Sequence, residues 1–273
     1  MRKFKVEVCV DSVESAFAAV EGGADRLEIC GNLALGGGTT PSVGLVRLIK
    51  QACPENIELM AMIRPRTGDF LYTSDEISVM LEDIKAFAEI GITGVVFGAL
   101  TSDGRIDIER TTLLTNEAVK YGLQVCFHRA FDMVVDQKEA LSELCKISGI
   151  TRLLTSGGKP SASLGLPSLV SLCMSLDPES GASQASRNQS SQIEMMPGSG
   201  INSGTITPVL RALMPFRYVR SIHMSGGGFV ESTMQYRPEG MGMGVGGAGE
   251  WGVWRTSKDA VRRVRKIVDD ELE

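Results

Sequence analysis

Short runs of apolar residues alternate along the chain with longer segments in which apolar positions recur at helical spacing. The short runs predict strands, the longer segments predict helices, and the pair recurs eight times. Eight repeats are typical of a single (β/α)8 TIM barrel with a parallel eight-stranded core, and an open doubly wound sheet is the alternative. The predicted strands cover residues 4–10, 26–30, 57–63, 94–98, 123–128, 151–155, 192–196 and 218–223. The predicted helices cover residues 12–20, 41–52, 74–90, 107–121, 136–147, 166–176, 204–213 and 257–272.

Two segments interrupt this alternation. Residues 177–191 are rich in Ser, Gln, Asn and Gly, and we expect a flexible insertion there. Residues 225–249 combine many glycines with Met234, Met241 and Met243, and we expect a loop on the active face of the barrel. With these two additions, residues 1–273 are expected to form one domain.

Alternation within each strand predicts which side chains enter the barrel, because successive side chains point to opposite faces. In the first strand, Val6, Val8 and Val10 suit the helix-facing side, which leaves Glu7 and Cys9 pointing inward. The same reasoning predicts a polar, sulfur-rich interior in place of the usual branched apolar layers. Its expected members are Glu7, Cys9, Arg26, Glu28, Cys30, Met60, Met62, Arg64, Gln124, Cys126, His128, Ser221 and His223.

The charges in this predicted interior must be paired or hydrated. Arg64 is the expected partner of Glu7 and Glu28. The only two histidines of the chain, His128 and His223, fall at the C-terminal ends of predicted strands. Barrel enzymes keep their catalytic groups at those ends, so the mouth is the expected functional face.

Composition narrows the classes of partner. The net charge is -5 and the pI is near 5.3, which argues against a nucleic-acid or anionic membrane surface. No signal peptide is evident, and no apolar run approaches the roughly 18 residues of a membrane helix. The six cysteines are scattered without a C-x-x-C pair, which favours reduced thiols in a cytosolic protein.

Several motifs that contain these residues resemble one known family. They include EVCVDS at 7–12, GGADRLEIC at 22–30, GGTTPS at 37–42, MIRPR at 62–66, VFGALT at 96–101, FHRAFD at 127–132 and LTSG at 154–157. Together they resemble the CutC copper-homeostasis family through about the first two thirds of the chain. The last third of the chain resembles the family motifs less closely. There, MPGSGI at 196–201 differs from the family's Pro-Gly-Gly-Gly run by one replacement.

The resemblance implies a (β/α)8 barrel that binds Cu(I) and takes part in copper buffering or trafficking. It associates the metal with two cysteines that map to Cys9 and Cys30, and thiolates are ligands that suit Cu(I). It also implies a homo-oligomer in the cytoplasm, with some eukaryotic members also nuclear. No reaction is firmly tied to the family.

The polar interior also fits a second hypothesis, a TIM-barrel enzyme that acts on a small phosphorylated or carboxylated metabolite. Glu28 or His128 would serve as acid or base, and Arg64 and Arg129 would bind anionic groups. The alternative for these residues and Asp132 is a buried ion-pair network that orders the barrel mouth. Glycines after the seventh strand predict an anion site, or only a turn, formed by Gly198, Ser199 and Gly200.

Overall fold

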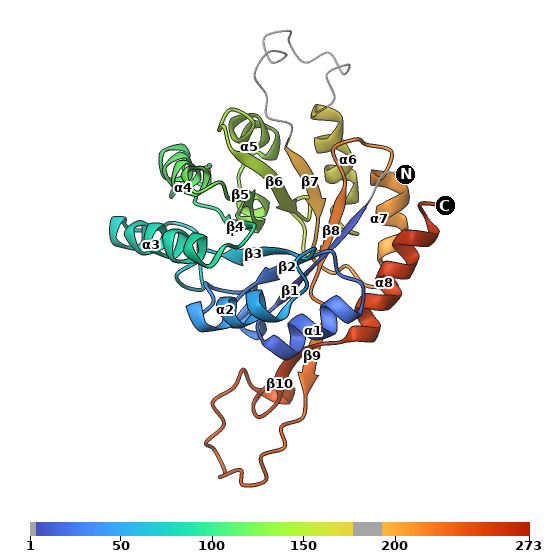
Figure 1. The fold of residues 1–273 in the computed structure, drawn as a ribbon. Helices are drawn as coiled ribbons and strands as arrows, with labels where there is room; N and C mark the ends of the chain where they lie inside the picture. Colours follow the sequence, from blue (N-terminus) through green and yellow to red (C-terminus); the bar gives the residue numbers. More distant parts are fainter. Residues whose placement is uncertain (1–3, 177–192) are drawn as a thin grey trace.

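The computed structural model describes residues 4–176 and 193–273. Eight parallel strands form one sheet in the order β7-β6-β5-β4-β3-β2-β1-β8, and the helices ring it (Figure 1). The end strands β7 and β8 also contact each other, and the N–H of Met195 on β7 donates to the carbonyl of Tyr218, which precedes β8, at 2.9 Å. The predicted TIM barrel is therefore confirmed. The strands are β1 (Lys5–Val10), β2 (Arg26–Ile29), β3 (Glu58–Met62), β4 (Gly94–Phe97), β5 (Gln124–Phe127), β6 (Ile150–Thr155), β7 (Glu194–Pro197) and β8 (Ser221–Met224).

Each barrel strand is followed by a helix whose apolar face packs on the sheet. Polar residues cap the helices as their sequences suggest: the Ser12 and Ser42 hydroxyls accept backbone N–H groups of the first turn. Thr73 and Glu76 form a reciprocal capping box. The helices are α1 (Val13–Glu21), α2 (Val43–Ala52), α3 (Ser74–Ile90), α4 (Ile108–Lys120), α5 (Gln137–Leu144), α6 (Leu166–Ser175), α7 (Ile206–Leu213) and α8 (Lys258–Asp270).

The two faces of the strands carry different cores, as the alternation predicts. Between strands and helices lies the large apolar core, to which Val6, Val8 and Val10 belong. Inside the barrel lies a smaller, sulfur-rich core. Its buried members are Cys9, Cys30, Met60, Met62, Val96, Cys126, Leu154 and Met196.

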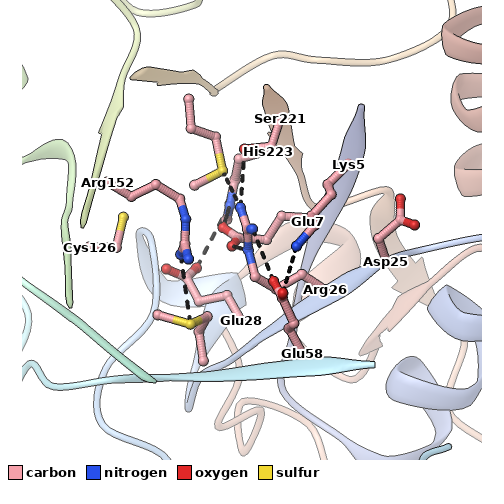
Figure 2. A network of polar contacts seen from close by, with 12 residues as sticks. Lys5, Glu7, Asp25, Arg26, Glu28, Glu58, Cys126, Arg152, Ser221 and His223 are labelled. Carbon is pink, nitrogen blue, oxygen red and sulfur yellow. Dashed lines mark hydrogen bonds and ion pairs between the residues drawn. The ribbon is translucent and has the colours of Figure 1, made fainter. Parts of the chain in front are cut away.

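A charged layer lies beside the sulfur-rich core. Arg26 donates to Glu7, lies 3.3 Å from a Glu58 oxygen and donates to the Ser221 hydroxyl at 3.1 Å (Figure 2). The expected pairing of Arg64 with Glu7 and Glu28 is wrong. The register of β1 on β2 places Arg26 directly beside Glu7, whereas Arg64 follows the end of β3 at the mouth.

The chain between β8 and α8 forms a protruding arm. Strands β9 (Gly227–Val230) and β10 (Val253–Thr256) pair antiparallel at its base, and residues 231–252 project away from the barrel (Figure 1). The expected loop over 225–249 is thus a hairpin with a long tip. The other expected insertion, 177–191, lies outside the described residues. Among the described residues, no helix combines the length and apolar character that crossing a bilayer requires.

Candidate functional site

A cavity of about 810 Å³ opens at the carboxyl ends of the barrel strands. Its wall includes Cys9 on β1, Glu28 on β2, Met62 on β3, His128 after β5 and His223 on β8. Strand ends at this face are where barrel enzymes assemble their sites. The structure therefore gathers at one cavity most of the side chains that the sequence singles out.

Cys9, Glu28 and His223 form a compact buried group in this cavity. One ligand atom from each residue lies within 4.8 Å of the other two, which is close enough to hold a metal ion. Strand β1 lies between β2 and β8, and its register places Cys9 beside Glu28 and Glu7 beside His223. The ring of His223 lies between two carboxylates, with Nδ1 2.7 Å from Glu7 and Nε2 3.8 Å from Glu28 (Figure 2).

Burial and neighbouring charges together raise the pKa values of all three members of this group. Burial raises the pKa of Glu28 to about 7, against the opposing effect of His223. Burial alone would lower the pKa of His223, but Glu28 and the Cys9 sulfur hold it well above its usual value. Burial raises the pKa of the Cys9 thiol. The carboxyl group of Glu28 therefore titrates near neutrality.

Cys30 follows β2 and contacts Glu28, which lines the cavity. Its Sγ is 3.5 Å from Glu28 Oε2, its side chain is fully buried, and it does not line the cavity. Gly38 covers it so closely that a Cβ there would lie 3.0 Å from the Cys30 sulfur. Burial raises the pKa of this thiol well above its ordinary value. The two expected copper ligands thus flank one carboxylate, Cys9 on the wall and Cys30 beneath the loop.

The interior methionines differ in what their sulfur atoms contact. Met196 lies 3.1 Å from an Arg26 donor, and Met60 lies 3.7 Å from an Arg152 donor. Met62 lines the cavity, whereas Met60 and Met196 do not. Met62 is accordingly the interior thioether that a molecule in the cavity would meet.

Arg64 is buried at the mouth and is held by loop carbonyls. Its Nη atoms donate to the carbonyls of Gly36, Gly38 and Gly68 at 3.1, 2.9 and 3.0 Å. Its guanidinium carbon lies 5.0 Å from the centre of the Phe70 ring. Arg64 therefore fixes two glycine-containing loops and still lines the cavity.

His128 follows β5 and contacts the same aromatic ring. Its imidazole meets Phe70 edge-on with centroids 4.8 Å apart, and the Ala130 N–H donates to Nδ1 at 3.2 Å. Burial lowers the pKa of His128 to about 3, and nearby Arg64 acts in the same direction. His128 is therefore uncharged near neutral pH.

Arg129 and Asp132 belong to a structural network. Arg129 Nε donates to Asp132 at 2.7 Å, and Thr155, Ser156 and Gly158 also donate to the same carboxylate. Asp132 thus ties the 3-10 helix after β5 to the loop after β6. These contacts engage both oxygens of Asp132, and Arg129 and Asp132 also line the cavity.

The glycine loop after β7 lies partly in the cavity wall. Ser199 and Gly200 line the cavity, and Gly198 does not. The Gly198 N–H donates to the Thr155 carbonyl, and the Ser199 hydroxyl donates to the Pro160 carbonyl at 2.8 Å. Two donors of the expected anion site are therefore engaged inside the protein.

Sequence patterns did not indicate Phe70 and Lys159, two of the residues that line the cavity. Phe70 was not singled out, although it lies in the GDFLY segment at 68–72 and contacts both Arg64 and His128. Lys159 also lines the cavity without having been considered. An aromatic residue inside a charged motif was the available signal for Phe70, whereas nothing local marked Lys159.

Comparisons with known proteins agree with this architecture. The model of the CutC family matches residues 4–228, which end at the base of the arm. A CutC protein of Chromobacterium violaceum is 38% identical over 264 residues, covering 97% of this chain and 98% of that protein. The copper homeostasis protein cutC homolog of Mus musculus is 41% identical over 270 residues, covering 98% and 91%.

A solved structure shares the fold. The CutC protein of Streptococcus agalactiae superposes with a TM-score of 0.68 at 29% identity, covering 81% of this chain and 97% of that one. The family match spans the strands that carry Cys9, Glu28, His128 and His223. This chain belongs to the CutC family.

Proposed function

We propose that this protein binds Cu(I) at the barrel mouth and takes part in copper homeostasis by buffering or carrying the ion. The name of the mouse relative, a copper homeostasis protein, supports this role. The proposal treats copper as cargo. It assigns no reaction to the metal.

The observation that carries the proposal is the group of Cys9, Glu28 and His223 with Cys30 against Glu28. Thiolate and imidazole donors suit Cu(I), whereas a carboxylate suits harder ions. Cys9 and Cys30 are the proposed ligands, and His223 supplies the nearest imidazole. Binding displaces the thiol protons, because the thiolate is the form that ligates the metal.

A competitive Cu(I) titration against a chromophoric chelator, without oxygen, tests the proposal. The wild type should bind one ion per chain. Cys9→Ser and Cys30→Ser should each weaken binding by about 100-fold or more, since losing even an outer partner of a ligand costs roughly 10–100-fold. Cys145→Ser is the control, because Cys145 is half-buried at the end of α5 and does not line the cavity.

Circular dichroism of each variant confirms that it is folded before titration. Equal stoichiometry and affinity in the wild type and both cavity variants would refute the assignment of Cys9 and Cys30. Loss of binding in Cys145→Ser as well would show that the thiols act without regard to position, and would refute it too.

The proposal includes a compartment and an assembly state. We place the protein in the cytoplasm, where thiols stay reduced and Cu(I) is the accessible form, and we expect a homo-oligomer. Cell fractionation tests the compartment. Removal of the arm between β9 and β10 tests the assembly state.

A further inference from the structure

Three buried polar atoms around the cavity lack a hydrogen-bond partner within the described part of the chain. They are Glu28 Oε1, Arg64 Nε and His128 Nε2. Each side chain lines the cavity and is at most 5% exposed. A buried polar atom without a partner costs free energy, so such atoms in a cavity call for a molecule that completes them.

The hydrogen-bond pattern of His128 fixes its role. Because Nδ1 accepts the Ala130 N–H, the hydrogen of the neutral ring is on Nε2. Phe70 packs edge-on against the ring, which sets its orientation. His128 therefore offers the cavity one uncharged N–H donor in a fixed place.

Arg64 offers a second donor close by. Three loop carbonyls occupy its Nη atoms and immobilise the guanidinium, which leaves the Nε–H unpaired. Arg64 and His128 contact the same Phe70 ring, so both donors lie along one stretch of the wall. Two donors that are already held in place lose little conformational entropy when they bind a ligand.

The charges of this wall favour an anion. Within the described residues, neither Arg64 nor Lys159 has a carboxylate within 4.0 Å, and both line the cavity. Asp132, the nearby carboxylate, is already paired with Arg129 and backbone donors. Glu28 lies on β2 in the metal-binding group. The wall that follows β3, β5 and β6 therefore carries unbalanced positive charge.

We propose that Arg64 and His128 form a binding site for a small metabolite bearing a carboxylate or phosphate group. The Arg64 Nε–H and His128 Nε2–H donate to its oxygen atoms, and Lys159 attracts it to the mouth. Apolar side chains complete the wall, so the body of the ligand is small and partly apolar. These lining residues are Leu33, Met62, Phe70, Met133, Leu154 and Ile201.

This site goes beyond the proposed copper function. It uses the wall after β3 and β5, whereas the copper group belongs to β1, β2 and β8. Both Arg64 and Cys9 line the same cavity. The site is tested on metal-free protein, which keeps its failure distinct from a failure of copper binding.

The test uses pyruvate, succinate and inorganic phosphate as probes on protein freed of metal and chelator. Only two histidines are present, so [15N]histidine labelling gives two ring spectra. We expect the His128 ring to show the Nε2–H tautomer and its signals to move on addition of a probe. The melting temperature should rise with the same probe. Comparison of the carboxylate probes with phosphate identifies the group that the site prefers.

Variants assign the effect to the two donors. Arg64→Lys and His128→Phe should each lower the affinity for the probe by about tenfold or more, which is the effect of losing a hydrogen bond to a charged group. His128→Gln should restore part of the affinity, since its amide donates. Arg152→Lys is the matched control, because Arg152 is buried in the barrel but does not line the cavity.

The readout is the shift that a probe causes in each variant, so a lowered intrinsic stability does not mimic lost binding. The proposal is overturned if no probe moves the His128 signals or raises the melting temperature. It is equally overturned if a probe binds Arg64→Lys and His128→Phe as tightly as the wild type.

Discussion

Glu7 is a carboxylate enclosed by cations inside the barrel. It is 1% exposed, accepts from Arg26 and lies 2.7 Å from His223 Nδ1. Burial would raise its pKa, but Arg26 and His223 together hold that pKa well below its usual range. Glu7 therefore stays ionised and orients both neighbours. Its effect on stability shows most clearly when it alone is removed, because a buried cation then loses its partner.

We expect Glu7→Gln to lower the free energy of unfolding by about 3 kcal/mol, within the range for breaking a buried ion pair. Arg26 keeps Glu58 and Ser221 as partners, which limits the loss. Urea unfolding measures the change. Glu271→Gln removes the exposed pair with Arg211 and should leave the midpoint nearly unchanged. Equal effects of the two substitutions would contradict this account.

His128 predicts a pH dependence of stability. Its pKa is lowered to about 3 by burial, whereas an unfolded histidine titrates near about 6.5. Below a pH of about 6.5, the unfolded chain takes up a proton at this histidine and the folded protein does not. The free energy of unfolding therefore decreases as the pH is lowered. The contribution reaches at most about 1.4 kcal/mol per pH unit.

Urea unfolding of the wild type and His128→Gln between pH 7.5 and 4.5 measures this dependence. The wild type should lose stability relative to the variant as the pH falls. Other titrating groups are common to both proteins and cancel in the difference. Parallel curves would show that His128 is accessible to protons in the folded state.

Alternation along a strand was enough to predict the inward side chains, and Cys9, Glu28 and Cys126 are buried as expected. The partner of each charge was not predictable in the same way. Arg64 lies two residues beyond the end of β3, where loop carbonyls surround it. Arg26 pairs with Glu7 through an inter-strand register that no local pattern records.

At the scale of elements, the connection from β2 to α2 packs against Cys30, one of the two proposed copper ligands. Gly36 and Gly38 in this connection both have positive φ, 103° and 84°, where side chains are strained. They differ in surroundings. A Cβ on Gly38 would lie 2.9 Å from the Cys30 Cβ, whereas a Cβ on Gly36 would meet nothing within 4 Å.

We therefore expect Gly38→Ala to weaken Cu(I) binding and Gly36→Ala to leave it near the wild-type value. Backbone strain is common to both variants, so the crowding of Cys30, and to a lesser degree of Leu33, separates them. The same competitive titration measures the affinities, with urea unfolding to compare stability. Equal affinities would mean that Cys30 does not contribute to the site.

The helices and strands themselves were largely predictable from the sequence. Residues 74–90 were predicted as a helix and α3 has those bounds, because Thr73 and Glu76 cap it. The hairpin at 227–256 was missed, since its strands are short and separated by a long glycine-rich tip. Propensity is weak where glycine dominates, and pairing of β9 with β10 spans more than twenty residues.

On the scale of the whole molecule, closure of the barrel creates the site. Glu7 and His223 are 216 residues apart in sequence and meet because β8 pairs with β1. The group of Cys9, Glu28 and His223 therefore depends on complete folding, since its members come from both ends of the chain. Sequence patterns predicted eight repeats, and a parallel barrel of eight strands must close by pairing the last strand with the first. The register of that pairing, which sets Glu7 beside His223, was not predictable from the sequence.

The arm is the part of the described fold that projects from this closed barrel, and it bears on assembly. Its tip carries several exposed apolar side chains. Clusters of exposed apolar side chains usually mark surfaces that contact another molecule. None of residues 228–252 lines the cavity, so the arm does not close over the mouth in this structure. The exposed side chains are Met234, Tyr236, Met241, Met243 and Val245.

We expect the arm to contribute to the homo-oligomer. Replacing residues 231–252 with a short glycine-serine turn should yield a folded monomer, since Val230 and Val253 are already paired neighbours at its base. Light scattering after gel filtration measures the mass of both proteins. Tyr236→Ser with Met243→Ser should weaken assembly with the arm intact, because the two side chains are 75% and 90% exposed. An unchanged oligomer after removal of the arm would place the contact on the helices of the barrel, and a monomeric wild type would contradict the assembly itself.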